Sequence, residues 1–265
     1  TEVAPGLILP RAMAIEWPNI KKMELDTIVI TATRNDNPGL RQSKFGHYPC
    51  LPKGYEYPRD NEGNYLYPLA QLNLAEMPRL KGYPESGYLQ FYIGTNDCFG
   101  LSFDEKPSSF AVLYFEEQEL DEIETDFSFL GDILQTDYTP VSYPHTLSFS
   151  TKKEYTSTND HRTEADAALA LEHMIGKYTQ IEAELEDFFF GNFDSHGHKL
   201  GGYAYFTQYD IRAENEKIDE YVLLFQMDSD DDIMWGDCGV GNFFIHPDKL
   251  AKRDFSEVVY TWDCS

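Results

Sequence analysis

The sequence predicts an α+β fold in which mostly antiparallel β-sheets dominate and a few helices lie at the periphery. Aromatic residues, including 18 Tyr and 18 Phe, make up 15% of the 265 residues, and aromatic side chains favour strands. The apolar segments are short and bounded by Gly, Pro and Asn, as strands and turns are. Four of these segments also recur in the same order in two parts of the chain.

The first elements are expected near the N-terminus. "PRAMAIEWPNIKKMEL" predicts a short helix that is stopped or kinked at Pro18. "DTIVITATR" then predicts a strand, because most of its residues are β-branched.

The repeated segments predict an internal duplication. "SKFGHYPCLP", "YPLAQLNLAE", "GYLQFYIG" and "FAVLYFEE" correspond in order to "HKLGGYAYFTQ", "VLLFQMDSDD", "GVGNFFIH" and "FSEVVYTWD". The alignment pairs Lys44 with Lys199, Gln71 with Gln226, and Gln90 with Asn242, and the spacing from Lys to Gln is 27 residues in both copies. We expect two related halves, 43–117 and 198–264, in one domain that spans 1–265.

Each half is expected to form a small antiparallel sheet, with "GYLQFYIG" paired to "FAVLYF". Two related sheets commonly pack about a pseudo-twofold axis. The seam between them is a natural place for a ligand cleft.

The segment between the halves, 118–197, predicts an acidic and partly helical insert with 17 acidic and four basic residues. Thr163 with Asp166 resembles an N-terminal capping pair, and Gly176 is expected to end the first helix. A second helix is expected over 179–190. Apolar residues form a stripe on the first helix at Ala167, Leu169, Leu171 and Met174.

Charge and cysteine content limit the partners and the cellular compartment that we expect for this protein. The net charge of −25 opposes binding to nucleic acids and to anionic membranes. No apolar run of about 18 residues predicts a membrane span, and no signal peptide is visible. The closest two of the four cysteines, Cys238 and Cys264, are 26 residues apart, so reduced, buried thiols in a cytoplasmic protein are expected.

The stretch "DSDDDIMWGDCGVGNFF", residues 228–244, is tested first as a cation site. Asp228, Asp230 and Asp232 match the first, third and fifth places of an EF-hand loop, but Ile233 and Gly239 replace the required Gly and Glu. A solvated acidic turn between two strands is favoured. The alternative is a looser divalent-cation site formed by the three aspartates.

Other chemistries have weak signatures. "GVGNFF" lacks the third small residue of a dinucleotide-binding loop, and no G-x-S-x-G nucleophile motif occurs. Asp194, His196 and His198 could contribute to a zinc site, although a polar loop is the simpler interpretation. No catalytic residue and no cofactor is identified, which favours a protein that is not an enzyme.

The most distinctive residues are polar ones inside apolar strands. Either they bond to one another and to the backbone, or they line a cleft in the seam. Trp235 and Asp237 occur in the second half only, where they form part of a specialised site or fill the core and cap a turn. The candidate ligand-binding residues are Lys44, Gln71, Lys199, Gln226, Asp228, Trp235, Asp237 and Asn242.

The motifs "QSKFGHYPCLP", "LAQLNL", "HKLGGYAYFTQYDIR", "LLFQMDSDDDIMWGDCGVGNFFI" and "DFSEVVYTWDCS" resemble the YwqG-like family, DUF1963, from Ser43 to the C-terminus. The chain departs from the family pattern at His47, where a second Gly is usual, and at Ala204, where Pro is usual. The resemblance implies a duplicated β-rich core. It implies no activity and supplies no catalytic residues.

Two functions remain open. The first is a cytoplasmic binding protein that holds a basic protein through its acidic surface, as a bacterial immunity protein or antitoxin does. The alternative is a protein that binds a small molecule or a cation in the seam, with or without catalysis.

Overall fold

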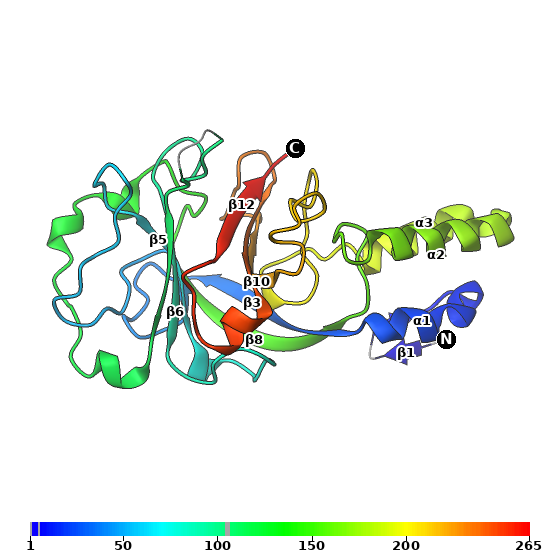
Figure 1. The fold of residues 1–265 in the computed structure, drawn as a ribbon, viewed down its shortest axis with the longest axis horizontal. Helices are drawn as coiled ribbons and strands as arrows, with labels where there is room; N and C mark the ends of the chain where they lie inside the picture. The colour runs from blue at the N-terminus through cyan, green and yellow to red at the C-terminus, as the bar shows by residue number, and fades with distance from the viewer. Residues whose placement is uncertain (1, 5, 104–106) are drawn as a thin grey trace.

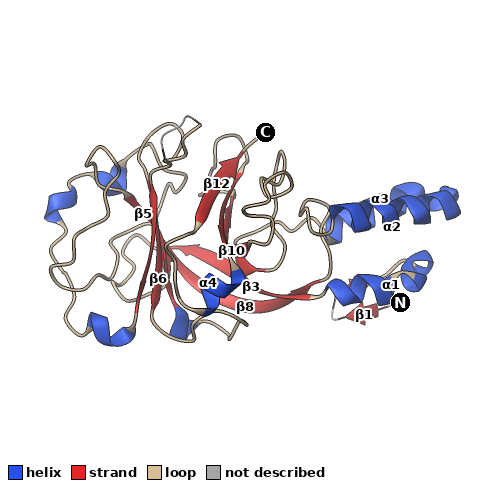
Figure 2. Cartoon of the chain, in the orientation of Figure 1, coloured by secondary structure: helices blue, strands red, loops and turns tan. Residues whose placement is uncertain are grey.

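Ten strands of the chain form one curled antiparallel sheet in the computed structural model, which describes residues 2–4, 6–103 and 107–265 (Figures 1 and 2). The strand order is β12-β11-β10-β9-β3-β8-β4-β5-β6-β7. The expected β-rich, mostly antiparallel fold with few helices is confirmed. The expected pair of small sheets is corrected to one continuous sheet. The strands are β3 (Leu25–Arg34), β4 (Lys44–Phe45), β5 (Tyr67–Asn73), β6 (Tyr88–Ile93), β7 (Phe110–Phe115), β8 (His145–Glu154), β9 (Lys199–Gly201), β10 (Val222–Asp228), β11 (Val240–Ile245) and β12 (Val259–Asp263).

The two central strands join the halves of the sheet. β3 and β8 pair over their full length, from Leu25 opposite Glu154 to Arg34 opposite His145. β9 to β12 extend the sheet from the free edge of β3, and β4 to β7 extend it from the free edge of β8. The expected strand over "DTIVITATR" is therefore β3. β8 was not predicted, because "HTLSFSTKKE" is rich in Ser, Thr and Lys and much of it is exposed.

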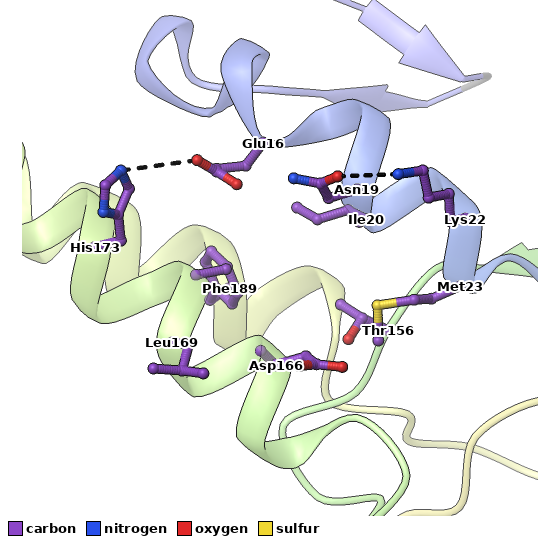
Figure 3. A pocket seen from close by; sticks show the side chains of 12 residues that line it. Glu16, Asn19, Ile20, Lys22, Met23, Thr156, Asp166, Leu169, His173 and Phe189 are labelled. Carbon is purple, nitrogen blue, oxygen red and sulfur yellow. Dashed lines mark hydrogen bonds and ion pairs between the residues drawn. The ribbon is translucent and has the colours of Figure 1, made fainter.

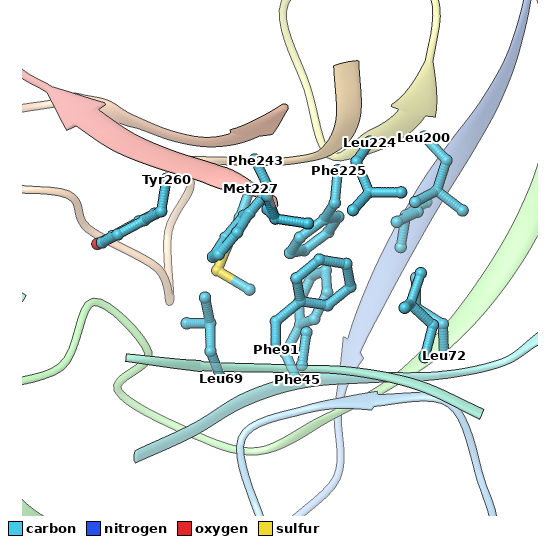
Figure 4. Close-up of a cluster of buried hydrophobic side chains, with 14 of the residues drawn as sticks. Phe45, Leu69, Leu72, Phe91, Leu200, Leu224, Phe225, Met227, Phe243 and Tyr260 are labelled. Atoms are coloured by element: carbon cyan, nitrogen blue, oxygen red, sulfur yellow. The ribbon is translucent and has the colours of Figure 1, made fainter. Parts of the chain in front are cut away.

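The curled sheet encloses the main core between its two halves (Figure 4). Phe91 of β6 packs against Phe225 of β10 and Phe243 of β11, with ring centroids 4.6 and 4.8 Å apart. Fully burying an aromatic side chain of this kind contributes about 1.5–3 kcal/mol to stability. The expected pairing of "GYLQFYIG" with "FAVLYF" is confirmed, since β6 and β7 pair from Tyr88 opposite Phe115 to Ile93 opposite Phe110.

A helical arm stands away from the sheet (Figure 1). It combines α2 (Glu164–Lys177) and α3 (Glu182–Asn192) with the N-terminal residues 2–4 and 6–23, which contain α1 (Trp17–Ile20) and the two-stranded sheet of β1 (Glu2–Ala4) and β2 (Leu7–Ile8). The arm has its own apolar cluster, formed by Leu9, Met13, Ile20, Tyr155, Ala167, Met174, Leu185, Phe189 and Phe193. Its helices therefore pack mainly on one another.

The remaining helices are short. α4 (Pro247–Ala251) precedes β12, and single 3-10 turns occur as η1 (Arg11–Ile15), η2 (Lys21–Met23), η3 (Leu74–Glu76), η4 (Glu117–Leu120), η5 (Ser128–Leu130), η6 (Ile133–Gln135) and η7 (Thr179–Ile181). Among the helices of the described ranges, none is long and apolar enough to cross a lipid bilayer.

Several local expectations are corrected. Pro18 lies in the first turn of α1 and does not stop it, since the first turn tolerates a missing N–H. Thr163 is the N-cap residue of α2, but its hydroxyl bonds to the backbone of Ser157 and makes no cap bond. α2 continues past Gly176 to Lys177. Of the four free thiols, Cys50 is buried and Cys238 is exposed.

Candidate functional site

The two aligned glutamines hold equivalent loops in the two halves. Gln71 Nε2 donates to the carbonyls of Leu40 and Gln42 at 2.8 and 3.0 Å. Gln226 Nε2 donates to the carbonyls of Ser195 and Gly197 at 3.0 and 2.9 Å. These acceptors stand four and two residues before the aligned lysine in each half. Both glutamine side chains are buried, and these bonds satisfy both N–H groups of each buried amide.

A second matched set of bonds holds the segment six residues after each lysine. The side-chain oxygen of Gln71 accepts from Cys50 N at 2.7 Å, and that of Gln226 accepts from Tyr205 N at 2.8 Å. Gln90 Nε2 donates to Cys50 O at 2.6 Å, and Asn242 Nδ2 donates to Tyr205 O at 2.8 Å. The four aligned amide side chains, Gln71, Gln90, Gln226 and Asn242, are therefore bonded to the backbone.

The two aligned lysines have different partners. Lys199 Nζ lies 2.9 and 3.2 Å from the carboxylate oxygens of Glu154, and both residues are buried. Burial lowers the pKa of Lys199, and Glu154 opposes that shift. Lys44 Nζ instead donates to the carbonyls of Gly39 and Leu40 at 2.8 and 2.9 Å. Burial lowers the pKa of Lys44 to about 7.

A buried ionic network fixes the segment that follows β9. Arg162 makes two bonds to the Asp160 carboxylate at 2.8 and 2.6 Å, and Arg212 makes two bonds to Asp210 at 2.9 and 2.7 Å. Arg212 also lies 2.9 Å from Asp160. Asp160 accepts from Ala204 N at 3.0 Å. The opposite charges hold the pKa values of both aspartates below their usual range.

Metal binding is tested on the same network. Within the described residues, Asp160, His161 and Asp210 are the only three candidate ligands whose atoms lie within 4.8 Å of one another. His161 Nδ1 is 2.9 Å from Asp210. Each carboxylate, however, already forms a two-bond pair with an arginine. Because the arginines balance both negative charges, a cation placed here would face two guanidinium groups, so the network fits a structural role.

Three histidines contact the aspartates of the acidic turn, residues 228–232. Asp228 lies 3.4 Å from His196, Asp230 lies 3.0 Å from His198, and Asp232 lies 3.4 Å from His145. The bond from His198 lowers the pKa of Asp230 to about 2. The three aspartates thus point to three different partners. A cation-binding role for them stays a prediction, as does a zinc site that uses Asp194.

Trp235 and Asp237 lie in different environments. The Trp235 side chain is fully buried in the main core, and a Cβ on Gly241 would come within 2.4 Å of its ring. Glycine at 241 therefore makes room for the indole. Asp237 is exposed, and its carbonyl accepts from Ser265 N at 3.2 Å. The structure brings neither residue to Lys44 or Gln71, and their ligand-binding role stays a prediction.

A cavity of about 600 Å³ lies at the seam. Leu80, Lys81 and Tyr83 line it from the first half, and Gly201, Gly202, Leu223 and Leu250 line it from the second. None of the eight candidate ligand-binding residues lines this cavity.

Another cavity lies in the arm, between α1 and α2, and has a volume of about 650 Å³ (Figure 3). Two helical faces line it, each with the i, i+3, i+4, i+7 spacing that places side chains on one side of a helix. The lining residues are Glu16, Asn19, Ile20 and Met23 on the N-terminal face and Asp166, Leu169, Ala170 and His173 on α2, together with Lys22, Thr156, Ala167 and Phe189. We call this cavity the arm groove.

The arm groove has an apolar floor and a polar rim. Ile20, Ala167 and Phe189 are buried at its base, whereas Leu169 is 63% exposed at its mouth. Glu16 lies 3.9 Å from His173 across the groove. Sequence analysis identified Leu169 only as part of an apolar stripe. Its exposure was missed because the position of α1, which leaves the groove open, is not encoded in the periodicity of α2.

The buried pair of Glu154 and Lys199 gives the first prediction. Lys199→Met should cost about 3–5 kcal/mol, because it leaves an unpaired buried carboxylate. The double variant Glu154→Gln/Lys199→Met should lose less stability than the two single variants lose in sum. Urea unfolding measures the free energy of unfolding of each single variant and of the double variant. Glu85→Gln, at an exposed pair with Arg79, is the control and should cost no more than about 1 kcal/mol. Additive effects at Glu154 and Lys199 would contradict the pairing.

Lys44 gives a pH prediction. Its pKa is lowered to about 7 on folding, so the unfolded chain binds more protons than the folded chain from about pH 7 up to the ordinary lysine range. This residue should therefore raise stability as the pH increases, by up to about 1.4 kcal/mol per pH unit. The slope for wild type minus the slope for Lys44→Met, from urea unfolding above pH 7, should be positive. Equal slopes would show that Lys44 stays charged.

Comparison with known protein families agrees with the resemblance seen in the motifs. The model of the domain of unknown function DUF1963 matches residues 43–264. A search of the curated proteins finds no match. The matched region contains the sheet from β4 to β12 and the helices α2, α3 and α4, whereas β3 and the N-terminal part of the arm precede it. The chain belongs to the DUF1963 family.

Proposed function

We propose that this chain is a non-enzymatic cytoplasmic binding protein that holds a basic protein partner in the arm groove. The observation that carries the proposal is an apolar groove on an acidic helical arm that projects from the sheet (Figures 1 and 3). In an immunity- or antitoxin-like role, the chain would capture a basic protein in this way.

Charge favours a basic partner. Between Glu164 and Asn192 the chain has seven carboxylates and one basic residue, Lys177, apart from His173. Most of these carboxylates are exposed. A positively charged segment would be steered toward this surface, and its association would slow as salt is added.

Exposed apolar side chains favour direct contact. Every strongly exposed Ile or Leu side chain in the described parts of the chain, namely Ile8, Ile15 and Leu169, lies on the arm. A partner helix with apolar residues on one face and Lys or Arg on the other would place the apolar face in the groove and the cations against the surrounding carboxylates.

The test uses a labelled amphipathic peptide with an apolar face and a Lys/Arg face, together with a matched peptide that carries Glu on the polar face. Fluorescence anisotropy should detect binding of the basic peptide, weaker at high salt, and little binding of the acidic one. Leu169→Asp should weaken binding by at least about tenfold, because it places a charge on the apolar contact.

Asp166→Asn and Asp187→Asn are a matched pair of charge changes. Asp166 lines the groove and exposed Asp187 does not, so only the first should lower affinity markedly. Equal binding of both peptides, binding that is indifferent to salt, or no effect of Leu169→Asp would overturn the proposal.

The seam cavity favours a second candidate function, binding of a small molecule. Its volume of about 600 Å³ lies in the usual range of about 300–1,000 Å³ for such sites. A panel of metabolites should contain a compound that raises the melting temperature of wild type and leaves Leu80→Trp, which fills the cavity, unchanged. A compound that stabilises both proteins equally binds elsewhere, and a panel without any stabilising compound would count against this function.

The matched bonds of Gln71, Gln90, Gln226 and Asn242 also support the proposed internal duplication. Superposition of 43–117 on 198–264 with these residues aligned tests it, and divergent backbone paths would contradict it.

A further inference from the structure

A small cavity of about 200 Å³ opens beside the last strand, away from the arm groove. Thr261, Trp262 and Asp263 of β12 line it, together with Cys264, with Leu101 and Phe103 of the loop after β6, and with Phe206, Gln208, Tyr209 and Ile211. Four of these ten side chains are aromatic, one is a carboxylate, and none is Lys or Arg.

Two of the aromatic side chains are unusually exposed. Phe103 is 77% exposed and Tyr209 is 69% exposed, and they are the two most exposed large hydrophobic side chains in the described parts of the chain. Rings that stay in water do not contribute the stabilising free energy that most aromatic residues gain when they are buried.

The other two aromatic side chains are held in place. The Trp262 indole N–H donates to Cys98 O at 2.7 Å, and its ring lies 5.0 Å from that of Phe99. The Phe206 ring stacks on Phe244 at 5.9 Å. The cavity therefore has two fixed rings and two exposed rings.

Asp263 gives the cavity its charge. Its two carboxylate oxygens accept from the backbone N–H groups of Thr207 and Gln208, at 3.1 and 3.0 Å. An ionised carboxylate offers about four acceptor positions, so these two bonds orient the group and leave acceptor positions unused. No Lys, Arg or His side chain in the described ranges pairs with Asp263. Burial raises the pKa of this carboxyl.

We propose that this cavity is an aromatic cage that binds the head group of an organic cation, an alkylammonium or a guanidinium. Aromatic faces carry negative potential and attract such cations, and Asp263 supplies the opposite charge. The volume is below the range of about 300–1,000 Å³ usual for complete small-molecule ligands, and it suits one head group. The inference does not depend on the proposed function, because the cage and the arm groove share no residue.

Isothermal titration calorimetry with the full chain tests the cage. The probes are choline, N-acetylarginine amide, potassium, and the uncharged isostere of choline in which carbon replaces nitrogen. Choline or the arginine derivative should bind, and the stronger of the two identifies the source of the cation. Potassium should bind much more weakly, because its shape does not fit the rings. The isostere should bind much more weakly, because it carries no charge.

The variants Phe103→Ala, Tyr209→Ala and Asp263→Asn should each weaken binding by about three- to tenfold. Phe103 and Tyr209 are exposed, so their removal should leave the fold intact. Tyr138→Ala removes an aromatic side chain that is 50% exposed at another place and should leave binding unchanged. Equal binding of choline and its isostere, binding that survives Phe103→Ala and Tyr209→Ala, or no binding of either organic cation would overturn the proposal.

Discussion

The antiparallel ladder between β3 and β8 is the interaction on which the rest of the structure depends. It runs over all ten residues of both strands, and each strand offers its other edge to one half of the sheet. Lys199 of β9 pairs opposite Val29 on β3, and Lys44 of β4 pairs opposite Thr146 on β8. Without the ladder, each half would be a sheet with an uncovered apolar face. With it, Phe91 of one half meets Phe225 of the other.

The same frame explains where the two halves differ. Gly46 and His47 follow Lys44 with φ of 66° at both residues, and Gly201 and Gly202 occupy the matching positions with φ of 66° and 70°. A Cβ on Gly202 would lie 2.3 Å from a carboxylate oxygen of Glu154, so the pair of Glu154 and Lys199 requires glycine there. Among the described residues, Lys44 Nζ bonds to the carbonyl groups of Gly39 and Leu40 and to no carboxylate, and histidine tolerates the left-handed region better than most residues. The departure at His47 is therefore consistent with the lack of a carboxylate partner for Lys44.

The parts of the fold that sequence could predict are those set by local pattern. The strands β3, β6 and β7, the two helices of the insert and the matched pairs such as Gln71 and Gln226 all follow from periodicity or repetition. β8 was not predicted, because only Leu147 and Phe149 give it an apolar alternation and the remaining residues are mostly Ser, Thr and Lys. The ionic network was also missed, since Asp160 and Asp210 are 50 residues apart and only the fold brings them together.

The candidate sites depend still more on tertiary structure. Leu169 belongs to an apolar stripe in sequence, and only the placement of α1 leaves it exposed beside a groove. The cage combines Phe103, Tyr209 and Asp263, which come from three separate segments. For both proposed sites, the net charge of −25 favours a cationic ligand.

The distribution of charge explains why these two sites would respond differently to salt. In the interior, Glu154, Asp160 and Asp210 are balanced by Lys199, Arg162 and Arg212, so the excess negative charge lies largely at the surface. Attraction between a basic segment and the exposed carboxylates of the arm acts across water and is screened by salt over about 8–10 Å. In the cage, a cation would touch aromatic faces and a half-buried carboxylate, where screening is weaker. If both proposals hold, one acidic surface would combine long-range attraction at the arm with short-range recognition beside β12.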